Sequence, residues 1–199
     1  MFRWIALAVF LGALTVSGYH RRRARAQGET ISRRREGGAL MAGRALVALP
    51  LFGGPLLYFI NPSSMSWSAF DAPLWLRWGG VALGLMVLCS VQWVLRNLGR
   101  NVSETVLTKA DHELVTSGPY KWIRHPLYTT GIGLFLALGL IAANWFILLC
   151  AAIALLTIRL AVIPREERAL CERFGAGYEQ YMSRTGAMWP RHWATHKRT

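Results

Sequence analysis

Five long apolar blocks, separated by short polar stretches, limit the folds that are open to this chain. A helix needs about 20 consecutive apolar residues to cross the roughly 30 Å hydrocarbon core of a bilayer. The five blocks are of this order, and hydrophobic residues make up 53% of the 199 residues, with a mean hydropathy of +0.28. The sequence therefore predicts an all-α integral membrane protein, a helix bundle surrounded by lipid.

We expect one membrane domain over residues 1–199, with three spanning helices within residues 1–95 and two more after them. The predicted helices cover residues 2–19, 39–60, 74–95, 126–142 and 145–163. Because only Ala143 and Asn144 separate the last two helices, these should form a tight antiparallel hairpin.

Individual residues in these helices suggest structural roles. Gly80 and Gly84 form a GxxxG pair, which typically permits close helix packing. Pro164 is expected to end the last spanning helix, since proline removes a backbone hydrogen bond. Arg77 lies near a helix end, where its long side chain could reach the lipid headgroups.

Basic residues alternate between the connections in a pattern that predicts topology. Seven arginines fall within residues 21–35, a second basic stretch covers residues 96–124, and the C-terminal tail is basic again. The connection over residues 61–73 and the turn at Asn144 contain no Lys or Arg. Because positively charged loops stay in the cytoplasm, the N-terminus should lie outside and the C-terminus in the cytosol. The Ala, Arg and Gly usage and the five-helix form suggest a prokaryotic cytoplasmic membrane, with anionic lipid against the arginine-rich stretch.

The formal net charge of +13 does not indicate a nucleic acid partner, because the positive residues cluster in particular connections. The three cysteines, Cys89, Cys150 and Cys171, lack the CxxC spacing of a zinc site. We therefore expect neither nucleic acid nor a metal ion as a partner.

The polar stretch over residues 112–128 contains the first group of candidate site residues. Pro126 suits the first turn of a helix, so Arg124, His125 and Pro126 could form a simple positively charged anchor. With Tyr128 in the same turn, the free N–H groups and the helix dipole could instead bind a carboxylate. Arg124 could add a bidentate contact to such an anion.

The turn at Gly118-Pro119 adds an apolar wall to this candidate site. It should bring Tyr120 and the pair Leu114-Val115 over the start of the helix predicted from Pro126. An aromatic ring beside an apolar pair is what a nucleobase pocket needs.

The doublet Glu166-Glu167 forms a second polar group just after the last apolar block. It could be a solvated helix face with local ion pairs. However, carboxylates at the membrane edge are costly without a partner, and the predicted hairpin brings them back toward Tyr128. Arg159 lies about one turn before the helix end, where it could extend to the headgroups or hold an anionic substrate group.

Together these segments resemble the isoprenylcysteine carboxyl methyltransferase family and the related phospholipid methyltransferases. The resemblance is carried by His112–Tyr120 (HELVTSGPY), Arg124–Tyr128 (RHPLY), Glu166-Glu167 and a tail of spaced Tyr, Arg and Gly residues over 174–190. It covers about the C-terminal half of the chain. One departure concerns the substrate: Val162 stands where eukaryotic prenylcysteine enzymes carry an arginine, and the nearest arginine within the helix is Arg159.

The resemblance implies a methyltransferase core over residues 96–199, built from a cofactor-binding loop, a helical hairpin and a C-terminal cytosolic helix. The implied cofactor is S-adenosyl-L-methionine, bound at the cytosolic edge of the membrane. The expected cofactor-binding residues are His112, Glu113, Leu114, Val115, Tyr120, His125, Pro126, Leu127, Tyr128 and Glu166. We assign Glu166, Glu167 and Arg124 to catalysis and Arg159 to substrate binding.

The sequence thus predicts an S-adenosylmethionine-dependent membrane methyltransferase that acts on a lipophilic or lipidated acceptor through a carboxylate, amine or thiol. Two alternatives stay open at this point. One is a membrane NADPH-dependent reductase of the sterol-reductase type, which would usually be longer. The other is a non-catalytic membrane scaffold whose charged connections only anchor it.

Overall fold

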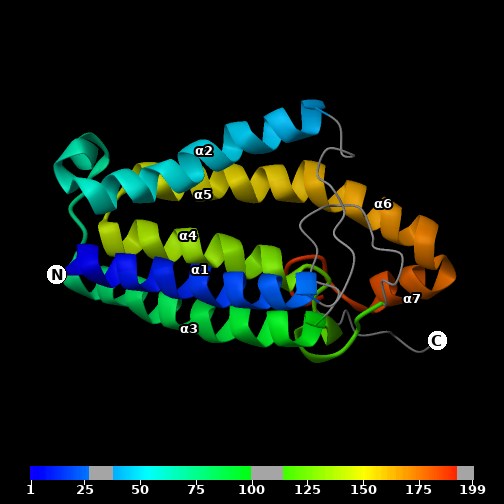
Figure 1. Ribbon diagram of the computed structural model, residues 1–199. Coiled ribbons are helices and arrows are strands. Elements are labelled where there is room, and N and C mark those ends of the chain that lie inside the picture. Colours follow the sequence, from blue (N-terminus) through cyan, green and yellow to red (C-terminus); the bar gives the residue numbers. More distant parts are fainter. Residues whose placement is uncertain (27–37, 100–113, 192–199) are drawn as a thin grey trace, which may run out of the picture.

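The chain folds into helices in the computed structural model, which describes residues 1–26, 38–99 and 114–191 (Figure 1). The α-helices are α1 (Phe2–Ala26), α2 (Gly38–Ile60), α3 (Leu74–Leu98), α4 (Pro126–Ala142), α5 (Trp145–Thr157), α6 (Ile163–Phe174) and α7 (Ala176–Arg184). Two short 3-10 helices, η2 (Pro62–Ser68) and η4 (Gly118–Lys121), and one π-helix, η5 (Ile158–Val162), complete the described elements. The predicted all-α class is confirmed.

Within the described part of the chain, three helices are long and apolar enough to cross a membrane: Phe2–Ala24, Leu74–Leu98 and the continuous helix Trp145–Phe174. The apolar helices Ala45–Ile60 and Pro126–Ala142 are shorter. Many large apolar side chains on α1, α2, α3 and α5 are exposed, as expected of surfaces that face lipid. The molecule is a multi-pass integral membrane protein, in which three of the five predicted spans meet the length and composition requirement.

Two helix ends differ from the sequence prediction. The first helix does not end at residue 19 but continues to Ala26, because arginine is a good helix former and no Gly or Pro interrupts residues 20–26. The last spanning helix does not end at Pro164, which occupies the first turn of α6. Just before it, Ile163 N–H bonds to Ile158 O, five residues back, and this π turn accommodates the proline within a continuous helix.

Helix α4 lies at the centre of the bundle. It packs against α1, α3 and α5, while α2 packs mainly against α5 (Figure 1). Ala137, Leu138 and Ile141 of α4 are almost fully buried. Because the start of a central helix is surrounded by other elements, side chains at the α4 N-terminus can be contacted from several directions.

The glycine pair on α3 permits the close approach of its neighbours, as predicted. A Cβ at Gly80 would lie 2.8 Å from Leu140 Cβ and 2.9 Å from Ile141 N on α4. A Cβ at Gly84 would lie 3.0 Å from Val9 Cγ1 of α1. Gly80 therefore sets how closely α3 approaches the central helix, and Gly84 sets how closely α3 approaches α1.

The turn between α4 and α5 is as tight as predicted and is fixed by a buried amide. Ala143 adopts a left-handed conformation, with φ 53° and ψ 53°. The Asn144 side chain accepts a hydrogen bond from Ile147 N at 3.1 Å and donates to Ser68 Oγ at 2.7 Å and Met65 O at 3.3 Å. The hairpin is thereby held to η2 at the end of the bundle opposite the α4 N-terminus (Figure 1).

Arg77 lies at this end too, but its contacts are with protein groups. Its Nε and Nη2 atoms donate to Ile141 O at 2.9 and 2.8 Å, and its guanidinium lies over the Phe2 ring at 3.9 Å. It therefore satisfies a carbonyl in the last turn of α4, which the headgroup prediction did not anticipate.

We predict that Gly80→Ala lowers the free energy of unfolding by about 1–3 kcal/mol, because the added methyl group would press against backbone and Cβ atoms of α4. Thermal unfolding of the detergent-purified protein measures the change. Gly79→Ala is the matched control, since a Cβ at Gly79 meets no atom within 4 Å. Equal melting temperatures for the two variants would contradict the close-packing role of Gly80.

Candidate functional site

The C-terminal segment folds back onto the start of α4. Helix α6 continues the line of α5, and Gly175, with φ 52°, allows the chain to turn into α7. The following residues run beside the segment that precedes α4: Arg124 N donates to Gly186 O and His125 N to Ala187 O, each at 2.9 Å. Gly186 N donates to Trp122 O at 3.2 Å, and a Cβ at Gly186 would collide with the carbonyl oxygen of Trp189. A short parallel pairing therefore fixes the start of α4 to the end of the chain.

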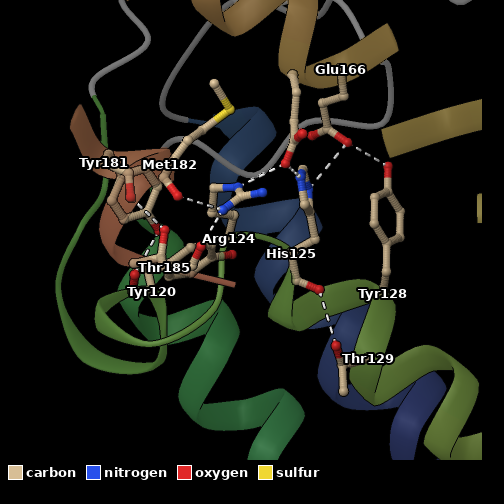
Figure 2. A network of polar contacts seen from close by, with 10 residues as sticks. Tyr120, Arg124, His125, Tyr128, Thr129, Glu166, Tyr181, Met182 and Thr185 are labelled. Carbon is tan, nitrogen blue, oxygen red and sulfur yellow. Dashed lines mark hydrogen bonds and ion pairs between the residues drawn. The ribbon is translucent and has the colours of Figure 1, made fainter. Parts of the chain in front are cut away.

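Two carboxylates of α6 meet the start of α4 (Figure 2). The Tyr128 hydroxyl donates to Glu166 Oε2 at 2.9 Å, and His125 Nδ1 lies 3.6 Å from the same oxygen. On the other side of the ring, His125 Nε2 lies 3.2 Å from Glu167 Oε1. The imidazole thus lies between the two carboxylates, and its side chain is only 4% exposed.

Each carboxylate uses one oxygen for these contacts. Glu166 makes both of its contacts through Oε2, and Glu167 contacts His125 and Arg124 through Oε1. Within residues 1–26, 38–99 and 114–191 no polar contact involves the second oxygen of either group. The side chains of Glu166 and Glu167 are 26% and 19% exposed, so a ligand could still reach them.

Arg124 donates hydrogen bonds to protein groups through Nε and Nη1. Its Nε donates to Glu167 Oε1 at 2.7 Å, and its Nη1 donates to the carbonyl oxygens of Met182, at 3.2 Å, and Thr185. The side chain is 11% exposed. Arg124 therefore ties Glu167 to the C-terminal end of α7, and these contacts use its Nε and Nη1 atoms, which the sequence had suggested for an anionic ligand.

Two tyrosines of α7 lie behind this network. Burial raises the pKa of Tyr181 to about 12, although the nearby Arg124 charge acts in the opposite direction. The Tyr181 hydroxyl is therefore neutral at physiological pH and donates to Tyr120 O at 2.6 Å. Burial, reinforced by the charge of Glu167, also raises the pKa of Tyr178. Its hydroxyl is buried and has no hydrogen-bond partner among the described residues.

The structure brings together only part of the predicted site. His112 and Glu113 lie outside the described residues. Tyr120 is buried, and its carbonyl joins η4 to α7, whereas Leu114 and Val115 are half-buried just before η4.

Three other predicted site residues contribute little to the polar network. Pro126 is buried in the first turn of α4, and Leu127 packs against a small cluster that includes Ala24, Val91 and Leu95. Arg159 is exposed on η5 and is not part of the network. Its substrate-binding role stays a prediction.

The N–H groups at the start of α4 are less free than the sequence suggested. His125 N is bonded to Ala187 O, while Tyr128 N and Thr129 N both bond to His125 O. The folded-back C-terminal segment thus takes a donor that was expected to bind a ligand carboxylate. Sequence spacing alone could not show this, since the acceptor comes from a residue about sixty positions away.

The sequence indicated no role for Tyr178, Tyr181 or Thr185. Their tail pattern of spaced aromatic and small residues pointed to the segment, but not to its contacts. Those contacts depend on how α7 turns at Gly175, which is a tertiary feature. Among the residues that the structure describes, no group of three or more His, Cys, Asp or Glu side chains is arranged to hold a metal ion.

Two curated relatives are similar to part of this chain. The cobalt-zinc-cadmium resistance protein CzcN of Cupriavidus metallidurans is 32% identical over 118 residues, which are 58% of this chain and 54% of that protein. The nickel-cobalt-cadmium resistance protein NccN of Alcaligenes xylosoxydans xylosoxydans is 35% identical over 79 residues, or 40% of this chain and 37% of that protein. The matched region thus spans about half or less of each relative's length.

The fold is similar to that of a solved membrane enzyme. The structure of the eukaryotic intramembrane Ras methyltransferase ICMT (isoprenylcysteine carboxyl methyltransferase) superposes with a TM-score of 0.55 at 19% identity. The superposition covers 92% of this chain and 66% of that one. The profile of the phospholipid methyltransferase family matches residues 75–177, just over half of the chain and including α3, α4, α5, α6 and the paired carboxylates. The protein therefore belongs to the phospholipid methyltransferase family.

Proposed function

We propose that this protein is an S-adenosylmethionine-dependent membrane methyltransferase that acts on a lipophilic acceptor. The proposal rests on contacts between the start of α4 and two carboxylates of α6. Tyr128 and His125 contact Glu166, and His125 also contacts Glu167, in a chain of this family. Perturbed and partly buried polar groups that gather at one place are typical of functional sites. A scaffold would not need two carboxylates and an imidazole gathered at one end of a membrane bundle.

The chemistry of the site fits the proposed cofactor. S-adenosylmethionine, when bound, would supply a methyl group attached to a positively charged sulfur. Its ammonium group needs a carboxylate, and Glu166 and Glu167 each keep one oxygen without a polar contact in the described part of the chain. The aromatic ring of Tyr128 suits a sulfonium, since cations are attracted to ring faces. The buried hydroxyl of Tyr178, which has no partner among the described residues, lies near these charges.

The residues of the site would promote the reaction mainly by holding the methyl donor and the acceptor in position. Methyl transfer is a displacement at carbon, so donor and acceptor must be held in line and in contact. His125 and Arg124 hold the two carboxylates in place, and the pairing at Gly186 and Ala187 holds His125. A carboxylate or thiolate acceptor needs no base. An amine acceptor must lose a proton, and Glu166 or Glu167 would then accept it.

A lipophilic acceptor follows from the location of the site. The carboxylates lie within the long helix that continues from the apolar residues of α5, next to the exposed apolar surface of the bundle. An acceptor with a lipid tail could therefore enter sideways from the bilayer. By the positive-inside rule, the basic connections favour a cytosolic location for this end, in a protein of a prokaryotic cytoplasmic membrane.

We expect Glu166→Gln to weaken S-adenosylmethionine binding by roughly 10- to 100-fold, because a charge-assisted hydrogen bond contributes about 1.5–3 kcal/mol. The amide oxygen can still accept the Tyr128 hydrogen bond, so the fold should be retained. Titration calorimetry on purified protein measures the affinity.

The matched control is Glu172→Gln, which removes the same charge from an exposed position on the same helix. It should bind the cofactor as tightly as the wild type. Wild-type affinity in Glu166→Gln, or saturable binding of NADPH in place of S-adenosylmethionine, would contradict the proposed site.

We also expect the methylated product to partition with lipids. Purified protein is incubated with S-adenosylmethionine labelled in its methyl group and a native lipid extract, and the label is followed into the organic phase. A tailed acceptor should react faster than its short water-soluble analogue, because the proposed route of entry is from the bilayer. Equal rates for the two acceptors would argue against lateral entry.

A further inference from the structure

A cavity lies beside the carboxylate network, on the other side of Arg124. Its volume is about 370 Å³, near the lower end of the ~300–1,000 Å³ typical of small-ligand sites. It is lined by Thr116, Lys121, Trp122, Tyr181, Arg184, Thr185, Pro190 and Arg191. In Figure 2, Tyr181 and Thr185 lie on one side of Arg124, with Glu166 and Tyr128 on the other.

The charge of this cavity is one-sided. Lys121, Arg184 and Arg191 line it, and no carboxylate does so among the residues that the structure describes. Two of the cations are held in place by the backbone: Arg184 Nε donates to Gln180 O at 3.3 Å, and Arg191 Nη1 donates to Ser183 O at 2.6 Å. Each guanidinium still has other N–H groups to offer a ligand. Three cationic side chains that line one cavity suit a phosphate group.

The surroundings of the cavity indicate which kind of molecule carries the phosphate group. Trp122 lies against Trp93 of α3, with ring centroids 5.9 Å apart, and both rings are about half exposed. Trp93 lies near the end of an apolar helix that is long enough to cross a membrane. Trp189, which precedes the lining residue Pro190, is exposed as well. Tryptophans in this position mark the headgroup level of a bilayer.

From these observations we infer that the cavity, here called the Lys121 pocket, binds the phosphate headgroup of an anionic phospholipid. Basic pockets at the headgroup level of membrane helices suit such lipids. This ligand is distinct from the methyl acceptor, since the pocket does not include Glu166, Glu167 or His125. A bound lipid would bridge η4 and α7, because Lys121 belongs to η4 and Arg184 belongs to α7. It would thereby support the Tyr181–Tyr120 contact, which joins the same two elements.

Lipid titration of delipidated, full-length protein in non-ionic detergent tests this inference. The probes are short-chain phosphatidylglycerol, short-chain phosphatidylcholine, glycerol 3-phosphate and inorganic phosphate, and calorimetry gives each affinity. We expect phosphatidylglycerol to bind most tightly. Lys121→Gln and Arg184→Gln should each weaken it roughly fivefold, and the double variant roughly 25-fold. Both residues are exposed, so the variants should fold.

The control Arg165→Gln removes one positive charge from an exposed position on α6 that does not line the pocket, and it should leave lipid affinity nearly unchanged. Equal binding of phosphatidylcholine and phosphatidylglycerol, or no loss in the double variant, would overturn the inference. If glycerol 3-phosphate bound as tightly as phosphatidylglycerol, the pocket would not select a lipid, and the inference would be overturned.

S-adenosylmethionine affinity is measured on the same variants to separate this inference from the proposed function. The double variant should bind the cofactor like the wild type. A parallel loss of cofactor affinity would overturn the inference, because the pocket would then belong to the cofactor. If wild-type protein binds phosphatidylglycerol as expected but not S-adenosylmethionine, the proposed function fails and the lipid pocket stands.

Discussion

Adjacent carboxylates at the edge of an apolar bundle need compensating charge and hydrogen bonds, because burying an unpaired charge is costly. Glu166 and Glu167 obtain both from the segment around the α4 N-terminus, through Arg124, His125 and Tyr128. Arg124 in turn bonds to the carbonyl oxygens of Met182 and Thr185 in α7 and just beyond it. One charged network therefore joins α4, α6 and α7, and each side chain in it is held by at least one other.

The arrangement of the helices brings the carboxylates of α6 to the start of α4. The tight turn fixed by Asn144 folds α5 antiparallel to α4, so residues that follow α5 return to the level at which α4 begins. The π turn before Pro164 lets the helix continue beyond the apolar residues, which carries the carboxylates on a rigid element. π turns inside helices are frequent at functional sites. At the other end, the close packing at Gly80 sets the position of α4 within the bundle.

Arg124 divides the polar end of the molecule into two environments of opposite charge. On one side, the oxygens of Glu166 and Glu167 that make no polar contact with the described residues favour a cationic ligand group. On the other side, the Lys121 pocket favours an anion. Thr185 belongs to both environments. Its carbonyl oxygen accepts a hydrogen bond from Arg124, and the residue also lines the Lys121 pocket. A ligand on either side would act on the same short segment at the end of α7. The proposed cofactor site and lipid site are thus neighbours that share supporting residues.

The sequence by itself determined the all-helical membrane class, the α4–α5 hairpin and the glycine contact, because apolar length, loop length and residue size are local properties. It also identified His125, Tyr128, Glu166 and Glu167 as candidates that the hairpin would bring together. It could not determine that Pro164 lies within a continuous helix, since π geometry depends on the packing of the whole turn.

Only the tertiary structure decided which partners the polar groups take. Tyr181 reaches Tyr120, and the backbone at Gly186 and Ala187 pairs with Arg124 and His125, because α7 turns back at Gly175. Such contacts join residues about sixty positions apart, and no local pattern encodes their geometry. The Lys121 pocket likewise exists only because η4 and α7 bring distant cations to one cavity.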